Sequence, residues 1–262
     1  MRVIAGILVI SISTALASVA SAAAPNMPAK LYRVDGRPVP VSCLEGLTSP
    51  EDDTRGTPID VRTCGNTELK PKVQTDGSIG YDTTDGGYFF YAYLGESGGL
   101  DILSLQSSGG GSGHFTQLVG VRHDGHLISW VKDIAGGDRC NGRISGERIS
   151  GGNLSFDQAI TPYDLIELAA PKEQMKAYHD LEDSAASCIG SVHRVGDGSH
   201  WTGVSLTEDD WPDQKGWTDR YTYQACFNNL YREAVHARAV ELNHGSVMMF
   251  ARTFATRCLP KR

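Results

Sequence analysis

The chain has 262 residues, of which 40% are hydrophobic and 21% charged, and this length can bury one large core or two smaller ones. Its formal net charge is −7, so we expect no basic face for nucleic acid or anionic lipid, whereas a cationic partner would be attracted. The same acidity is also typical of exported proteins that need only to stay in solution.

The N-terminus predicts export. Arg2 precedes an apolar stretch over residues 3–17, and the small residues Ala20-Ser21-Ala22 match the A-x-A pattern of a secretory cleavage site. We expect residues 1–22 to be a signal peptide. The stretch is short and broken by Ser and Thr, whereas a permanent membrane span needs about 20 apolar residues. We therefore expect a periplasmic or secreted protein without a membrane anchor.

Residues 23–158 predict an antiparallel β-rich domain, because short apolar runs are separated by turn signals at a density typical of a sandwich or barrel. The dipeptide Asp35-Gly36 predicts a tight turn, and segments 88–94 and 101–106 predict a hairpin. The glycine-rich segment 107–113 leads into another strand rather than into a helix, so it is no phosphate-binding loop. We interpret it as a mobile connection between strands, with a ligand-gating loop as the alternative.

A second hairpin is predicted with Asp124-Gly125 at the centre of a type I′ turn. Counting outward gives the cross-strand pairs His123–His126, Val121–Ile128 and Val119–Trp130. Two facing histidines could share a metal ion, but no third ligand is evident. We therefore interpret both as turn residues on the surface and expect no metal site.

Residues 159–262 predict a mainly helical region, so the fold class is α+β. Thr161 is a candidate N-cap before Pro162 at the first helical position. Apolar residues at spacings of three and four predict a second helix over 171–188. The Gly-, Asp- and Trp-rich stretch 190–220 predicts a long ordered loop with room for one short strand. The C-terminal segment predicts a helical hairpin that breaks at residues 243–245, where Gly245 would end the first helix.

Six cysteines follow the predicted leader, and an even number in an oxidising compartment favours three disulfides. The close spacings of zinc ligands are absent. If the C-terminal helices are antiparallel, Cys226 and Cys258 lie at comparable distances from the turn, which predicts a bridge between them. The remaining pairs that we expect are Cys43–Cys64 and Cys140–Cys188.

One local resemblance is found at the C-terminus. It rests on Cys226, Tyr231, Leu242, Phe250, Arg252 and Cys258, with the run "FARTFATRC" before the final cysteine. This stretch resembles the helical, disulfide-bonded domain of the LprI-type periplasmic lysozyme-inhibitor family. The resemblance implies a disulfide-bonded helical domain and an inhibitory role.

Two polar clusters are candidate binding sites. In segment 136–142, a disulfide at Cys140 would fix three polar side chains for recognition, namely Asp138, Arg139 and Asn141. The alternative is a rigid, ion-paired turn. In segment 207–217, carboxylates beside indoles suit a cationic protein or a sugar, and the candidates are Glu208, Asp209, Asp210 and Trp211. The alternative is a solvated acidic loop with buried tryptophans.

Two function hypotheses remain open. The sequence has no H-E-x-x-H, G-x-S-x-G or G-x-G-x-x-G pattern after the leader, so we name no catalytic residue and expect no cofactor. We favour an exported, disulfide-stabilised binding protein, such as an inhibitor or immunity factor that acts on a cationic enzyme, for example a cell-wall hydrolase. The alternative is a secreted hydrolase that uses His114, His193, His200 or the acidic loop.

Overall fold

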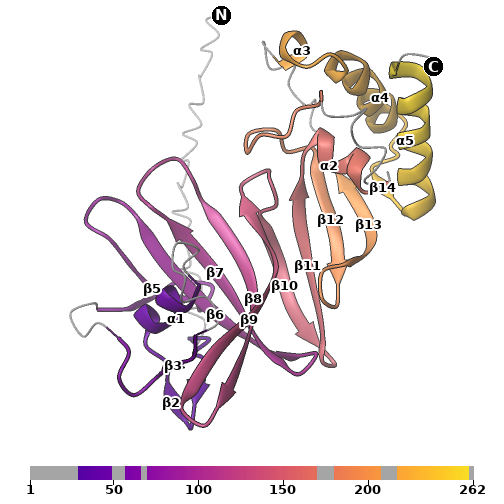
Figure 1. The fold of residues 1–262 in the computed structure, drawn as a ribbon. Helices are drawn as coiled ribbons and strands as arrows, with labels where there is room; N and C mark the ends of the chain where they lie inside the picture. The colour runs from indigo at the N-terminus through magenta and orange to yellow at the C-terminus, as the bar shows by residue number, and fades with distance from the viewer. Residues whose placement is uncertain (1–28, 49–56, 66–69, 170–179, 208–216, 260–262) are drawn as a thin grey trace, which may run out of the picture.

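The computed structural model describes residues 29–48, 57–65, 70–169, 180–207 and 217–259. Antiparallel strands are the main secondary structure, and a disulfide-bonded helical region follows at the C-terminal end, as predicted (Figure 1). The predicted signal peptide lies outside the described residues. Within the described part of the chain, no helix is long and apolar enough to cross a membrane.

The first sheet has seven antiparallel strands in the order β3-β9-β8-β7-β6-β5-β4. These strands are β3 (Ile59–Asp60), β4 (Lys72–Val73), β5 (Ile79–Asp82), β6 (Tyr88–Ser97), β7 (Leu100–Ser108), β8 (Phe115–Asp124) and β9 (Leu127–Asp138). The predicted hairpin of segments 88–94 and 101–106 is confirmed as β6 and β7, joined at Gly98-Gly99 with both glycines at positive φ. Segment 107–113 contributes the end of β7 and the connection to β8.

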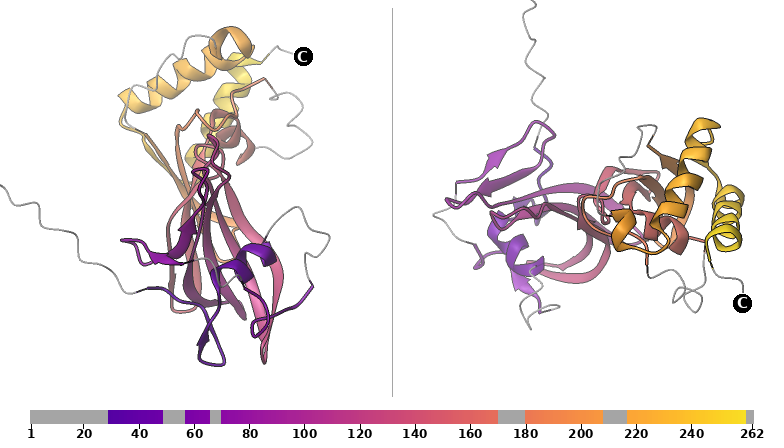
Figure 2. Two further views of the ribbon diagram at one scale, coloured as in Figure 1. Left: turned by 90° about the vertical axis from the view of Figure 1, so that its left-hand side faces the viewer. Right: turned by 90° about the horizontal axis from the view of Figure 1, so that it is seen from above.

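The N-terminal segment lies on one face of this sheet. It contains the short strands β1 (Arg33–Val34) and β2 (Arg37–Pro38), followed by the helix α1 (Val41–Thr48). The turn between the strands is the predicted one, with φ of 50° at Asp35 and 75° at Gly36. Figure 2 shows the seven-stranded sheet curving around α1.

The two faces of the curved sheet bury different cores. The face toward α1, here called the inner face, carries Leu103, Leu105, Val119 and Val121, which pack against Leu44 and its neighbours. The opposite, outer face packs on the second sheet through a smaller cluster of Leu100, Ile102, Leu118, Ile144, Leu154 and Phe156. Strand β7 is therefore buried on both sides over residues 100–105, so its apolar residues do not follow a strict alternation.

The second sheet has five antiparallel strands in the order β10-β11-β12-β13-β14. They are β10 (Ile144–Ser150), β11 (Asn153–Ile160), β12 (Gly190–Val195), β13 (His200–Leu206) and β14 (Glu241–Leu242). The sheet combines strands from both sides of the boundary that we placed at residue 158. The prediction of a long loop over 190–220 is wrong for residues 190–206, which form β12 and β13. Val192 in β12 and its partner Val204 in β13 are buried against the helices. The glycines and polar residues around these two valines concealed the alternation of buried and exposed residues that is typical of strands.

One face of the second sheet is covered by the helices α2 (Pro162–Glu167), α4 (Gln224–His236) and α5 (His244–Cys258), and the short helix α3 (Trp217–Arg220) contacts α4. Helix α2 begins as predicted: Thr161 and Asp164 form a reciprocal capping box. The core beneath the helices contains the aromatic cluster of Phe227, Tyr231 and Phe254.

The predicted helix over 171–188 is wrong in its second half. Residues 170–179 lie outside the described part, and residues 180–189 form turns instead. Glu182 donates its backbone N–H to Gln224 Oε1 at 2.8 Å, and Ser187 donates its hydroxyl to the carbonyl of Ser184 at 2.7 Å. These side-chain contacts, together with the disulfide at Cys188, replace the backbone hydrogen bonds of a helix.

The break between the last two helices differs from the predicted one. Helix α4 ends at His236, and Arg238 takes the left-handed conformation with φ of 55°. The chain then adds β14 to the edge of the second sheet, and Asn243 caps α5 by accepting the N–H of Ser246 at 3.0 Å. Gly245 lies inside α5 and ends no helix.

The three disulfides are Cys43–Cys64, Cys140–Cys188 and Cys226–Cys258, the pairs expected from the sequence. The first closes the N-terminal segment around α1. The second joins the turn after β9 to the segment before β12. The third joins α4 to α5.

Candidate ligand-binding cavity

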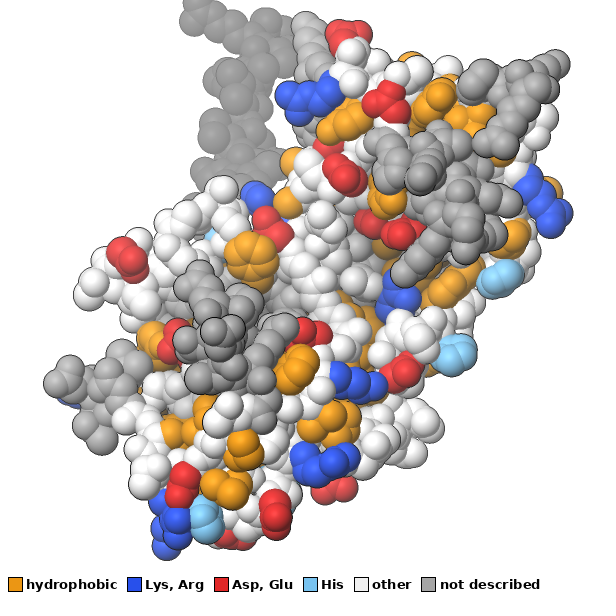
Figure 3. Space-filling view, in the orientation of Figure 1, with side chains coloured by type: hydrophobic (Ala, Val, Ile, Leu, Met, Phe, Trp, Pro, Cys, Tyr) orange, Lys and Arg blue, Asp and Glu red, His pale blue; other side chains and the backbone are white. Residues whose placement is uncertain are grey.

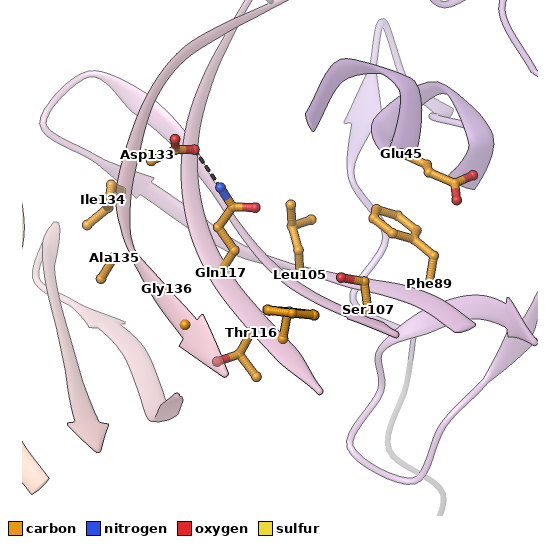
Figure 4. A pocket seen from close by; sticks show the side chains of 12 residues that line it. Glu45, Phe89, Leu105, Ser107, Thr116, Gln117, Asp133, Ile134, Ala135 and Gly136 are labelled. Carbon is orange, nitrogen blue, oxygen red and sulfur yellow. Dashed lines mark hydrogen bonds between the residues drawn. The ribbon is translucent and has the colours of Figure 1, made fainter. Parts of the chain in front are cut away.

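A cavity of about 580 Å³ lies at one end of the inner face, between the sheet and α1 (Figure 4). Its wall comes from α1, β6, β7, β8 and β9. Side chains that shape it include Glu45, Phe89, Leu105, Phe115, Gln117 and Asp133. This volume is in the range of small-molecule sites, about 300–1,000 Å³.

The strand register brings these side chains to one face. Leu105 lies opposite Gln117, while Ser107 lies opposite both Phe89 and Phe115. Side chains at directly paired positions share a face of the sheet, so this set continues the apolar rows of the inner face.

Strand β9 reaches the cavity through an irregularity. Its register with β8 shifts between Leu118 and Val119, so that Gly136 pairs with Gln117 and Asp133 pairs with Val119. The extra residue keeps Asp133 on the inner face although it lies three positions before Gly136.

Among the described residues that line the cavity, the ionisable side chains are two carboxylates. Asp133 accepts hydrogen bonds from Gln117 Nε2 at 2.6 Å and Trp130 Nε1 at 3.2 Å. Glu45 accepts a hydrogen bond from the hydroxyl of Tyr81. Burial and this hydrogen bond raise the pKa of Tyr81, so the phenol remains the donor of this hydrogen bond. The cavity wall is therefore negative.

The remaining surface is largely apolar. Phe89 and Leu105 are almost fully buried at 6% and 3% exposure, whereas Phe115 is 49% exposed. An exposed phenylalanine beside a cavity offers an aromatic face to a ligand. The arrangement accepts a compact molecule with an apolar body and a cationic or hydrogen-bond-donating group.

The predicted cluster at 136–142 forms a paired turn. Asp138 and Arg139 bind each other, with Nη2 and Oδ2 3.0 Å apart, and Asp138 also accepts the backbone N–H of His114 at 2.9 Å. Asn141 donates to the carbonyl of Asp183 at 3.2 Å. These contacts match the rigid, ion-paired turn that we gave as the alternative. The cluster at 208–211 lies outside the described residues.

The predicted histidine pair is not formed. The turn between β8 and β9 contains Gly125 and His126 rather than Asp124 and Gly125, so His123 pairs with Ile128. Gly125 takes φ of 54°, and a glycine at the first central position accommodates this conformation without strain. Within the described chain, no group of three or more His, Cys, Asp or Glu side chains could hold a metal ion.

The histidines considered for a hydrolase lie in three separate places. His114 lies 3.1 Å from the hydroxyl of Tyr88, and His193 lies 2.8 Å from Asp157. His200 lies 2.9 Å from Ser199 Oγ, which donates to Asp197 at 2.6 Å. In this last group the serine bridges the other two, whereas in a catalytic triad the histidine bridges serine and carboxylate.

The other end of the inner face holds a buried carboxylate. Asp101 accepts hydrogen bonds from the hydroxyls of Tyr32 at 2.8 Å and Tyr93 at 3.1 Å. His123 Nδ1 lies 2.9 Å from the same carboxylate, and its side chain is 42% exposed. No sequence motif identified this cluster, because its members come from four separate segments.

The fold and the cavity together define a disulfide-stabilised α+β protein with a ligand-sized cavity on the inner face of a curved antiparallel sheet. Comparison of the chain with protein-family models, with curated proteins and with solved structures finds no match in any of the three. The resemblance of the C-terminal segment to the LprI-type family therefore stays a prediction.

Proposed function

We propose that the protein is an exported binding protein whose inner-face cavity holds an organic cation. The observation that carries this proposal is the charge of the cavity wall: the ionisable side chains among its described lining residues are the carboxylates of Glu45 and Asp133. Aromatic and aliphatic groups surround them, as a ligand with an apolar body requires. The three disulfides fit a protein that works in an oxidising compartment.

The cation has two chemical sources. One is a free amine that fills the cavity. The other is a lysine or arginine side chain of a basic protein, such as a cell-wall hydrolase, for which this protein would be an inhibitor. The net charge of −7 supports attraction of either. On the face shown in Figure 3, Lys and Arg side chains are scattered rather than gathered in one basic area.

The test is a calorimetric titration with benzylamine and with its neutral analogue benzyl alcohol. We expect the amine to bind at least about tenfold more tightly than the alcohol, which corresponds to about 1.4 kcal/mol. Glu45→Gln and Asp133→Asn should each reduce amine binding. Asp124→Asn removes the same charge from the exposed hairpin end, outside the cavity, and should leave binding unchanged. Near-UV circular dichroism checks that each variant keeps its fold.

A second arm distinguishes the two sources. A basic cell-wall hydrolase is added to the protein at low and at high salt, with and without benzylamine. If the hydrolase binds, and if this binding weakens with salt and competes with the amine, the cavity is assigned to a protein side chain. Amine binding without hydrolase binding assigns it to a free amine. Equal affinity for amine and alcohol, or no effect of Glu45→Gln and Asp133→Asn, would contradict the proposal.

A further inference from the structure

A second cavity, of about 480 Å³, lies where the second sheet meets α2 and the turn after β9. Side chains that shape it include Asn141, Gln158, Asp164, Glu167, Arg194 and Trp201. Its wall is more polar than that of the first cavity and carries charges of both signs. The two cavities approach each other at Gly136, which lines both.

Arg194 is the cation of this cavity, and its hydrogen bonds go to neutral groups. Its Nε donates to Gln158 Oε1 at 2.5 Å, and Nη1 donates to the carbonyl of Gly198 at 2.9 Å. Within the described chain, Arg194 forms no ion pair. Burial lowers the pKa of its guanidinium, which shows that its surroundings disfavour the charge.

A partly buried guanidinium without a paired anion is costly, so the cavity around it favours a ligand that supplies one. A guanidinium has five N–H donors, of which the two contacts above use two. The same contacts fix the plane of the group. The remaining donors on one edge match the two oxygens of a carboxylate.

The wall formed by α2 carries the opposite charge. Asp164 and Glu167 are three residues apart on this short helix and therefore lie on one side of it. Both attract Arg194 electrostatically without forming an ion pair with it. Asp164 is engaged in the capping box with Thr161, whereas Glu167 is exposed. Glu167 is thus the carboxylate best placed to receive a cationic group of a ligand.

An aromatic side chain completes the cavity. The indole of Trp201 stacks on the imidazole of His244, with ring centroids 5.0 Å apart and planes 20° from parallel. This contact holds the indole in place beside Arg194, because Trp201 in β13 pairs directly with Arg194 in β12. An indole with a fixed orientation in a cavity wall offers an apolar surface to the carbon atoms of a ligand.

We propose that this second cavity binds a small zwitterion of the α-amino-acid class, with the ligand carboxylate on Arg194, its ammonium group toward Glu167 and its side chain toward Trp201. A simple anion would satisfy Arg194 but would be repelled by Asp164 and Glu167. A simple cation would meet the converse repulsion from Arg194. An α-amino acid carries an ammonium and a carboxylate group on the same carbon atom, so it matches both the cationic wall at Arg194 and the anionic wall at α2.

The test is calorimetric titration of the full protein with each standard L-amino acid. The tightest binder is then compared with two analogues, one without the ammonium group and one without the carboxylate. Because an amine is also expected to bind the first cavity, the amino acid and both analogues are titrated into the Glu45→Gln, Asp133→Asn double variant as well. In that variant we expect each analogue to bind at least tenfold more weakly than the amino acid. Arg194→Gln and Glu167→Gln should each reduce binding of the amino acid to a similar extent, on the order of tenfold for one lost charged hydrogen bond.

A matched control and a second variant make the outcome decisive. Arg148→Gln changes the same charge at an exposed position of β10 and should leave binding intact. If Arg194→Gln fails to fold, the exposed Glu167→Gln still tests the site. The proposal is overturned if no amino acid binds, if the analogue without an ammonium group binds as well, or if Glu167→Gln binds like the wild type.

Discussion

At the scale of single residues, Asp101 is the most constrained charged group on the inner face. It is 6% exposed. Its carboxylate accepts hydrogen bonds from the hydroxyls of Tyr32 in the N-terminal segment and Tyr93 in β6, and it lies 2.9 Å from Nδ1 of His123 in β8. A buried carboxylate is tolerated where hydrogen bonds compensate its lost hydration. Asp101 therefore fixes the N-terminal segment on the sheet, at the opposite end from the ligand cavity.

The substitution Asp101→Asn should destabilise the protein. The amide keeps one acceptor oxygen but presents an NH₂ group to neighbours that donate, so at least one hydroxyl loses its charged acceptor. We expect the free energy of unfolding to fall by about 2 kcal/mol, the range of hydrogen bonds to a charged group. Urea unfolding followed by tryptophan fluorescence measures it. Asp124→Asn at the exposed end of the β8–β9 hairpin is the matched control, and an equal loss in both variants would contradict this role for Asp101.

At the scale of secondary-structure elements, α4 and α5 depend on a covalent link. Their shared core rests on Phe227, Phe250 and Phe254, and the ring centroids of Phe250 and Phe254 lie 5.6 and 6.1 Å from that of Phe227. The bridge between Cys226 and Cys258 closes a loop with a sequence separation of 32. Closing a loop of this length removes conformational freedom chiefly from the unfolded chain.

Replacing both Cys226 and Cys258 with alanine should lower the free energy of unfolding by about 4 kcal/mol, from the loop-closure relation for this separation. Differential scanning calorimetry measures the loss. The control is Glu233→Gln, which breaks the exposed ion pair between the same two helices with Arg257 and should leave the melting temperature nearly unchanged. A double alanine variant as stable as the wild type would show that packing alone holds the helices.

The elements also show where local sequence signals are sufficient. The turn at Asp35-Gly36 and the N-cap at Thr161 depend on neighbouring residues only, and both were predicted. The register of the β8–β9 hairpin was wrong by one residue in the turn, because Asp-Gly and Gly-His are both acceptable centres. Tertiary packing on β7 and β3 decides between them. Strands β12 and β13 were missed because pairing along the sheet specifies them rather than a local signal: β12 pairs with β11, and β13 pairs with β12 and β14.

At the scale of the whole molecule, neither cavity could be predicted from local patterns. The first takes Glu45 from α1 and other side chains from four strands, and only the completed sheet brings them together. One signal was present: Gln117 interrupts the apolar row of Phe115, Val119 and Val121 on β8. A polar side chain in a buried row is a candidate for a cavity. The second cavity needs the β12–β13 hairpin, which the sequence did not reveal.

The inner face also gathers four tyrosines with raised pKa values. They come from the N-terminal segment and from two strands, and they are Tyr32, Tyr81, Tyr91 and Tyr93. Burial is the largest cause in each. It raises the pKa of Tyr91 and of Tyr93 from 10.0 to about 12. Tyr91 is fully buried, and its hydroxyl donates to the carbonyl of Val39 at 3.3 Å.

These shifts predict alkaline unfolding. A phenol whose pKa is higher in the folded than in the unfolded chain contributes its full stability below pH 10, and this contribution is lost as the pH rises toward about 12. Tyr91 alone gives a slope of at most about 1.4 kcal/mol per pH unit in that window. Urea unfolding from about pH 9 to about pH 11.5 should show a steep loss of stability. Tyr91→Phe removes one titrating group, so its stability should start lower at neutral pH and fall less steeply. Parallel curves for the two proteins would show that Tyr91 does not couple ionisation to unfolding, and that the inner face tolerates a charged phenolate.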